Sequence, residues 1–284
     1  MSGTVEHGGA TALAKVPAVT LGFWLVKVLA TTLGETAGDA VSMSWLGETT
    51  SAANGWGYLI GTVIFAVPLV LLVLAQIRAR GFNPWLYWAT ILASTTAGTT
   101  LADFFTRTLF TRTLHVDQAL SYLLGSLSLL GCVLATLLVW RRALGTVSVG
   151  SVATPRAEAF YWLTITFSQT LGTALGDWTA DSFGEATVMG LESGYVLGAL
   201  VFVALLAGVA LLYRFTALSR TVLFWAAFIL TRPLGATVGD FLDKPLAKGG
   251  LDFSRPLAST VLLVAIVLLV AVLPQRAKGG ITPG

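Results

Sequence analysis

Four aspartates recur at one fixed spacing along an otherwise apolar chain. Each lies 15 residues after a tryptophan that itself follows an aromatic residue, as Asp39 does after Phe23 and Trp24. The other three are Asp103, Asp177 and Asp240. On an α-helix, residues four apart share a face, so the positions 7, 11 and 15 residues after each tryptophan form one stripe. This spacing predicts a polar face on each of four helices.

The stripe offers oxygen ligands at most of its positions. Its members are Thr31, Glu35 and Asp39, then Thr95, Thr99 and Asp103, then Gln169, Thr173 and Asp177, and finally Arg232, Ala236 and Asp240. Carboxylate and hydroxyl oxygens suit Mg²⁺, Mn²⁺ or Ca²⁺. We therefore predict a hard-cation site formed by Asp39, Glu35, Asp103, Asp177 and Asp240, in which Asp39 and Glu35 dominate. The supporting residues would be Thr31, Thr95, Thr99, Gln169, Thr173, Lys27 and Arg232.

A purely structural role for the aspartates is the alternative. Fifteen residues of helix rise about 22 Å, so an aspartate that far from an interfacial tryptophan would lie near the opposite boundary of the membrane, where water can solvate it. However, an anion near the C-terminal end of a helix opposes the helix macrodipole. Four such positions predict that a cation compensates them.

Three further charges make the four copies unequal. They are Lys27, Glu35 and Arg232. Arg232 lies two helical turns from Asp240, where it would be a tethered counterion for a cluster of carboxylates. Alternatively, these charges form buried pairs that fix the register of the helices. The acidic groups outnumber the basic ones, and neighbouring carboxylates hold protons more tightly. This excess predicts a bound cation or protons.

The composition identifies an integral membrane protein. Of 284 residues, 55% are hydrophobic and only 11% charged, and the mean hydropathy is +0.81, whereas soluble domains carry about 25% charged residues. A single cysteine and two histidines exclude a disulfide framework and disfavour Cu⁺ and Zn²⁺. The net charge of +3 does not indicate nucleic-acid binding.

Eight apolar segments are long enough to cross a bilayer. They lie near residues 18–42, 56–77, 84–106, 119–140, 159–180, 194–213, 221–242 and 256–273. Lysine and arginine are concentrated in alternate loops, which marks the cytoplasmic face. We therefore expect a multi-pass protein of the inner (plasma) membrane with both termini in the cytoplasm.

The aspartates belong to an internal repeat. The segments that end GETAGD, GTTLAD, GTALGD and GATVGD align without gaps, and each is followed by a second apolar segment. Three of those second segments begin with a tyrosine followed three residues later by glycine: Tyr58, Tyr122 and Tyr195; the fourth is diverged, with Phe253 at this point. Parallel repeats of this kind are related by an axis along the membrane normal. A longer linker around residues 141–158 divides them into two halves.

These motifs resemble a family of bacterial membrane proteins with four tandem "repeat of unknown function" units. Each unit in that family has two transmembrane segments and a characteristic tryptophan. The resemblance implies an all-α membrane fold of eight transmembrane helices in four parallel two-helix repeats, but it implies no activity. The repeats would span about 18–77, 84–140, 159–213 and 221–273 within a single membrane domain 1–284. The repeated tryptophans are expected to be interfacial anchors.

Function is predicted from the residues themselves. The preferred hypothesis is a transporter for Mn²⁺ or Mg²⁺, coupled to protons, in which one half rocks against the other. The alternatives are a structural or partner-binding membrane protein without transport, and a carrier of a small organic cation, since aromatic residues follow the aspartates. No HExxH or GxSxG motif is present, so we expect no enzyme. We expect the lipid bilayer and the transported ion as partners and no other cofactor.

Overall fold

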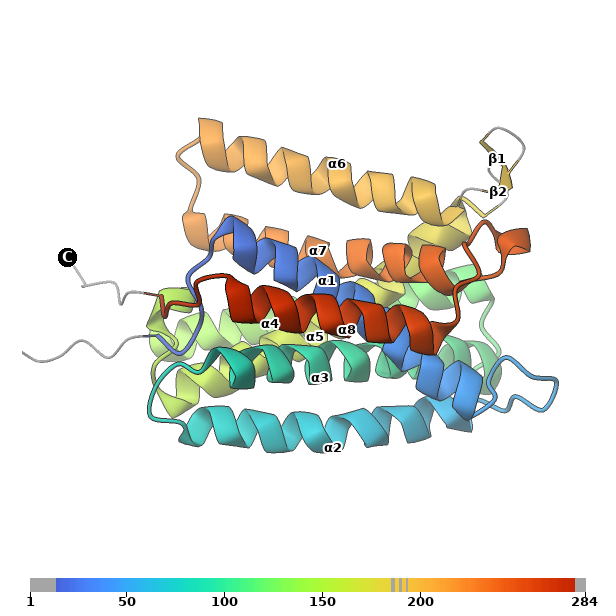
Figure 1. The fold of residues 1–284 in the computed structure, drawn as a ribbon, viewed down its shortest axis with the longest axis horizontal. Coiled ribbons are helices and arrows are strands. Elements are labelled where there is room, and N and C mark those ends of the chain that lie inside the picture. Colours follow the sequence, from blue (N-terminus) through green and yellow to red (C-terminus); the bar gives the residue numbers. More distant parts are fainter. Residues whose placement is uncertain (1–13, 185–186, 189–190, 193, 279–284) are drawn as a thin grey trace, which may run out of the picture.

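The computed structural model describes residues 14–184, 187–188, 191–192 and 194–278, and it is almost entirely helical (Figure 1). Its long helices are α1 (Leu21–Asp39), α2 (Trp56–Arg78), α3 (Pro84–Asp103), α4 (Gln118–Leu144), α5 (Pro155–Ser182), α6 (Gly194–Phe215), α7 (Arg220–Asp243) and α8 (Arg255–Val272). The shorter elements are π-helices at Ala40–Trp45 and Phe104–Thr113, 3₁₀ turns at Val149–Ser151 and Leu246–Lys248, and the antiparallel strands β1 (Thr187–Val188) and β2 (Leu191–Glu192). The predicted all-helical fold is confirmed.

Several helices begin at a polar residue that caps them. The side chains of Thr20, Asn83 and Thr154 each accept a hydrogen bond from a backbone N–H of the first turn that follows. Such caps satisfy N–H groups that have no partner within the helix. Because these three residues cap α1, α3 and α5, they fix where three of the four repeats begin.

The odd-numbered helices α1, α3, α5 and α7 form a closed inner ring. Each packs against the next, and α7 packs against α1. At every junction the glycine of one repeat faces the stripe residue 7 positions after the tryptophan of the next repeat. These contacts are Gly34 with Thr95, Gly98 with Gln169, Gly172 with Arg232, and Gly235 with Thr31. A Cβ atom at Gly34 would lie 2.4 Å from Thr95, so the small residue permits this close approach.

The even-numbered helices form an outer layer that is displaced by one repeat. Helix α2 packs mainly on α3, α4 on α5, α6 on α7, and α8 on α1. The contact between α8 and α1 closes the ring, and the chain ends pair beside it. The backbone N–H of Ala18 donates to the carbonyl of Arg276 over 2.8 Å, and that of Lys278 donates to Val16 over 2.9 Å.

Five of the described helices are long and apolar enough to cross a membrane: α2, α4, α6, α7 and α8. The chain is therefore a multi-pass membrane protein. Helices α1, α3 and α5 of the inner ring do not reach that hydropathy, whereas α7 of the same ring does. The exposed side chains of the outer helices are mostly large and apolar, such as Val63, Leu130 and Leu205.

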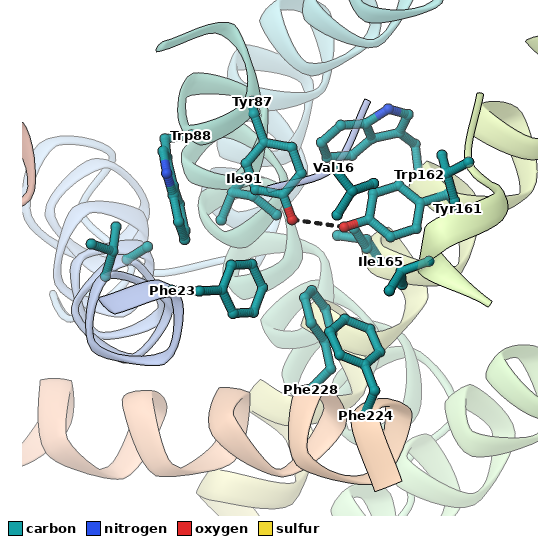
Figure 2. Close-up of a cluster of buried hydrophobic side chains, with 14 of the residues drawn as sticks. Val16, Phe23, Tyr87, Trp88, Ile91, Tyr161, Trp162, Ile165, Phe224 and Phe228 are labelled. Carbon is teal, nitrogen blue, oxygen red and sulfur yellow. Dashed lines mark hydrogen bonds between the residues drawn. The ribbon is translucent and has the colours of Figure 1, made fainter. Parts of the chain in front are cut away.

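Three of the four repeated tryptophans are buried in the bundle, which contradicts the anchoring role predicted for them, whereas Trp24 is only partly buried. Trp88, Trp162 and Trp225 are only 2%, 3% and 4% exposed. They join an aromatic cluster at the end of the bundle near the termini, in which Tyr87 and Tyr161 share a hydrogen bond of 2.7 Å (Figure 2). Burial is possible because loops at this end satisfy the indoles, as when Trp225 Nε1 donates to the carbonyl of Val147 over 2.9 Å.

Candidate functional site

The four repeated aspartates converge at the end of the inner ring opposite the termini, where all four are buried. One carboxylate oxygen each from Glu35, Asp177 and Asp240 lie within 4.8 Å of one another. The same holds for Asp39, Asp240 and Asp243. Asp240 belongs to both groups and therefore joins them into one carboxylate cluster.

Arg107 connects the remaining aspartate to this cluster. Its Nε lies 2.6 Å from Asp103 Oδ1, and its Nη2 lies 3.1 Å from Asp177 Oδ2. Arg107 lies just beyond the predicted apolar segment 84–106 and belongs to the π-helix Phe104–Thr113 that continues α3. A single guanidinium therefore links the second repeat to the third.

Lys244 does the same between the fourth repeat and the first. Its Nζ lies 2.5 Å from Asp39 Oδ2 and 2.8 Å from Asp240 Oδ1. Arg255, at the start of α8, adds a contact of 3.3 Å from its Nε to Asp243 Oδ2. Side chains of the protein itself therefore supply positive charge beside carboxylates that oppose the helix macrodipoles.

Sequence reasoning missed these cations, although a signal for them was present. In the second and fourth repeats the residue four positions after the aspartate is basic, namely Arg107 and Lys244. In the first and third repeats that position holds Met43 and Asp181. Each cation neutralises its own aspartate and that of the following repeat, so the pattern of charges is twofold although the helices are fourfold.

Arg232 neutralises a member of the carboxylate cluster, as predicted, and that member is Glu35. Its Nη2 lies 2.8 Å from Glu35 Oε2 and donates to the hydroxyls of Thr99 and Thr173 over 2.6 and 2.5 Å. Asp240, two turns along the same helix, binds Lys244. Arg232 projects from α7 past Gly172 of α5 into the ring, so it faces α1 and α3 rather than the next turns of its own helix.

Glu35 and Asp39, predicted as the dominant pair, lie in different carboxylate groups. The former faces Asp177 and Asp240, and the latter faces Asp240 and Asp243. They are neighbours on α1, but each reaches to carboxylates of other helices. Asp240 is the residue that the two groups share.

The stripe residues nearer the termini are buried but remain outside the carboxylate cluster. Thr31 donates to the carbonyls of Val28 and Thr231 over 2.8 and 3.2 Å. Thr95 Oγ1 and both amide atoms of Gln169 have no hydrogen-bond partner among the described residues. The same is true of Lys27 Nζ, which lies 4.2 Å from the ring centroid of Phe228.

Two cavities reach the carboxylate cluster from the end opposite the termini. One of about 330 Å³ is lined by Asp177 and Asp240 together with Arg107, Lys244 and Tyr122. Another of about 720 Å³ is lined by Tyr58, Tyr195, Asp243, Lys244, Phe253 and Arg255, among others. The repeated aromatic residues of the even-numbered segments therefore surround the entrance to the carboxylates.

The arrangement provides carboxylate oxygens for a cation together with built-in cations that compete for them. The carboxylates are Glu35, Asp39, Asp103, Asp177, Asp240 and Asp243, and the cations are Arg107, Arg232, Lys244 and Arg255. The carboxylates outnumber the cations. Chemically, this site can hold additional positive charge as metal ions or protons.

A family profile described as Repeat of Unknown Function (DUF347) matches the chain four times, at residues 22–82, 86–146, 160–219 and 223–276. Each match covers one odd-numbered helix and the even-numbered helix after it. No curated protein and no solved structure matches the chain.

Proposed function

The chain belongs to the family described as Repeat of Unknown Function (DUF347), and on that premise we propose that it transports a hard inorganic cation, Mn²⁺ or Mg²⁺, in exchange for protons. The observation that carries this proposal is the convergence of carboxylates from all four repeats. Buried ionisable groups in membrane proteins are costly and mark ion pathways and proton relays. An all-oxygen ligand set is the one that hard divalent ions prefer.

The charge balance supports a cation as the transported species. Removing carboxylates from water is unfavourable unless positive charge or protons accompany them. Since the carboxylates of the cluster outnumber its cations, the site needs additional positive charge to be neutral. A divalent ion and protons are interchangeable in this respect, which is the basis of exchange.

Arg107 and Lys244 have a role in this cycle as resident counterions. Each lies between two aspartates, in positions that an incoming metal ion would need. The metal ion displaces the side chains from the carboxylates, and the side chains return when it leaves. The unloaded site is then stabilised without a metal ion.

The proposal includes eight membrane-spanning helices, with α1, α3 and α5 shielded from lipid by the outer layer. The ends of α2, α4 and α6 that carry Arg78, Arg141 and Arg214 lie at the same end as the termini. Excess arginine at that end supports a cytoplasmic location for it. The carboxylate cluster would then open to the opposite side of the plasma membrane.

The contacts between repeats support a rocking motion of two halves. Arg107 with Asp177 and Lys244 with Asp39 cross the two boundaries between the half formed by repeats one and two and the half formed by repeats three and four. At the other end, Tyr87 and Tyr161 cross one of these boundaries. Breaking one set of contacts while keeping the other would expose the site to one side at a time.

A small organic cation is the second candidate substrate. The Arg107 guanidinium carbon lies 5.8 Å from the ring centroid of Tyr122, and Tyr58 and Tyr195 line the entrance. Aromatic faces beside carboxylates are suited to alkylated ammonium groups. If the substrate is an organic cation, tetramethylammonium should bind at these aromatic residues and be transported. If the substrate is Mn²⁺ held by oxygen ligands alone, tetramethylammonium should leave Mn²⁺ transport unchanged.

The test is cation flux into proteoliposomes with Mn²⁺ or Mg²⁺ outside and a pH gradient across the membrane. Asp240→Asn, in the residue shared by both carboxylate groups, is expected to abolish flux in a folded protein. Asp117→Asn is the matched control because this exposed aspartate caps α4, and asparagine caps helices equally well. Absence of flux in the wild type for every cation tested would refute transport. The ion pairs would then have a structural role, in stabilising the packing of the inner ring.

A further inference from the structure

A single lysine lies inside the ring far from the carboxylate cluster. Lys27 of α1 is 0% exposed, and its Nζ has no hydrogen-bond partner in the part of the chain that the structure describes. The nearest feature of note is the face of the Phe228 ring, at 4.2 Å from Nζ to the centroid. Burying an ammonium group without a counterion or a hydrogen-bond partner costs folding free energy. A functional role would explain why the lysine is present.

The repeat itself provides an internal comparison. Lys27 lies three residues after its tryptophan, and the corresponding residues of the other repeats are Ile91, Ile165 and Phe228. All four side chains are completely buried, and three of them are labelled in the aromatic cluster of Figure 2. The first repeat therefore places a charge in a layer that is apolar everywhere else.

Polar atoms without partners occupy the space between this layer and the carboxylates. Thr95 Oγ1, both amide atoms of Gln169, and Arg232 Nε are buried and have no hydrogen-bond partner among the described residues. Buried polar groups of this kind are normally satisfied by ordered water. Thr31 and Glu35 lie one and two turns beyond Lys27 on the same helix. These buried polar groups form a column that leads from the carboxylates to Lys27, and water bound in it would complete their hydrogen bonds.

The groups that face this amine are few. Helix α7 contributes Arg232, whose positive charge acts on Lys27. Tyr87 of α3 belongs to the same buried cluster as Phe228 and shares a hydrogen bond with Tyr161 of α5. In α8, which also packs on α1, the only charged residue is Arg255, which lies at the opposite end beside Asp243. On α1 itself the nearest carboxylate is Glu35, which binds Arg232.

We propose that Lys27 is the residue that couples cation movement to proton movement, an inference that rests on the proposed transport function. As an ammonium, Lys27 repels a divalent ion that leaves Glu35, Asp177 and Asp240 toward the termini. When it transfers a proton to water in the column, the N–H bond breaks, an O–H bond forms on the water, and Nζ keeps the electron pair. The charge at Lys27 is then gone. Of the described residues, Arg232, which is neutralised by Glu35, is the one cation left on the path, so the ion passes over a lower barrier. Recovery of one proton restores the barrier.

Flux measurements in proteoliposomes loaded with Mn²⁺ distinguish Mn²⁺ movement that is coupled to protons from movement that is not. One arm measures exchange of Mn²⁺ for Mn²⁺ without a pH gradient, and the other measures uptake driven by a pH gradient. Lys27→Ile introduces the side chain found at positions 91 and 165. We expect this variant to retain exchange but to lose the response to the pH gradient. Lys27→Arg keeps a permanent charge and should lower both fluxes about tenfold or more, which corresponds to about 1.4 kcal/mol in barrier height.

Controls make each outcome decisive. Ile165→Val changes the equivalent position of the third repeat and should leave both fluxes at the wild-type level. Because removing an unpaired buried charge favours folding, Lys27→Ile is expected to unfold at a higher temperature than the wild type, and Lys27→Met replaces it if it does not fold. A wild-type response to the pH gradient in Lys27→Ile refutes the coupling role alone. Absence of all flux in the wild type refutes the transport function as well.

Discussion

Replacing Arg232 by methionine removes the charge that neutralises Glu35 inside the ring. Arg232 is 0% exposed and its Nη2 lies 2.8 Å from Glu35 Oε2. Breaking a buried ion pair on one side costs about 3–5 kcal/mol because the other charge is left uncompensated. Methionine keeps an unbranched stem against Gly172, so little of the effect comes from lost packing. We expect Arg232→Met to lower the free energy of unfolding by about 3–5 kcal/mol.

The assay is equilibrium unfolding in detergent micelles by titration with a denaturing detergent. The double variant Arg232→Met with Glu35→Gln removes both charges and should recover most of the loss, because an uncharged pair leaves no ion behind. The control is Arg112→Met, which replaces an exposed arginine at the end of the bundle that holds the carboxylate cluster. It should change the free energy of unfolding by less than about 0.5 kcal/mol. If the double variant loses as much as the two single variants together, Arg232 and Glu35 do not stabilise each other and the reasoning fails.

The same variant also reports on metal binding. Without Arg232, the group formed by Glu35, Asp177 and Asp240 is more negative and should bind Mn²⁺ more tightly. A ligand present at about 100 times its dissociation constant adds about 2.7 kcal/mol to stability. We therefore expect Mn²⁺ to stabilise Arg232→Met more than the wild type in the same titration. Equal stabilisation of the two proteins would show that the ion does not use these carboxylates.

Two further predictions concern the ring and its resident cations. Gly34→Ala should destabilise the protein by about 1–3 kcal/mol because the new methyl group meets Thr95, whereas Gly131→Ala, where nothing lies within 4 Å, should be neutral or stabilising; equal effects in thermal unfolding would contradict the ring contact. Lys244→Gln frees Asp39 and Asp240, so Mn²⁺ affinity measured by calorimetry should rise while flux falls; unchanged affinity would contradict the competition between lysine and metal ion.

Much of the fold could be predicted because the signals for it are local. The apolar segment 56–77 became α2, Trp56–Arg78, and the segment 194–213 became α6, Gly194–Phe215. Repeats that enter the membrane from one side place equivalent residues at one level, which is why convergence of the aspartates was expected. Hydropathy and spacing carry this information without any knowledge of tertiary contacts.

The partners within the site could not be predicted from the same signals. Arg107 and Lys244 follow the apolar segments and were read as loop residues, because hydropathy cannot show that the helical turns continue past the aspartates. The direction in which Arg232 points depends on the packing of α7 between α5 and α1. Likewise, three of the four repeated tryptophans are buried because four helices close into a ring, and that closure is a long-range property of the whole chain.

The displaced outer layer has a consequence for how the protein is made. Of the described helices, α1 leaves the ribosome before the others, whereas two of its neighbours, α7 and α8, leave after all the others, so α1 packs only on α3 until they emerge. The ring therefore has one seam, between α1 and its neighbours α7 and α8, that is joined after all the other junctions. Since Val16 and Lys278 already lie side by side there, linking the ends and opening the chain between the first and second repeats would move the seam by one repeat. Such a permuted chain should assemble the same ring. Helix α3 would then be made first, and its neighbours α1 and α2 would be made last.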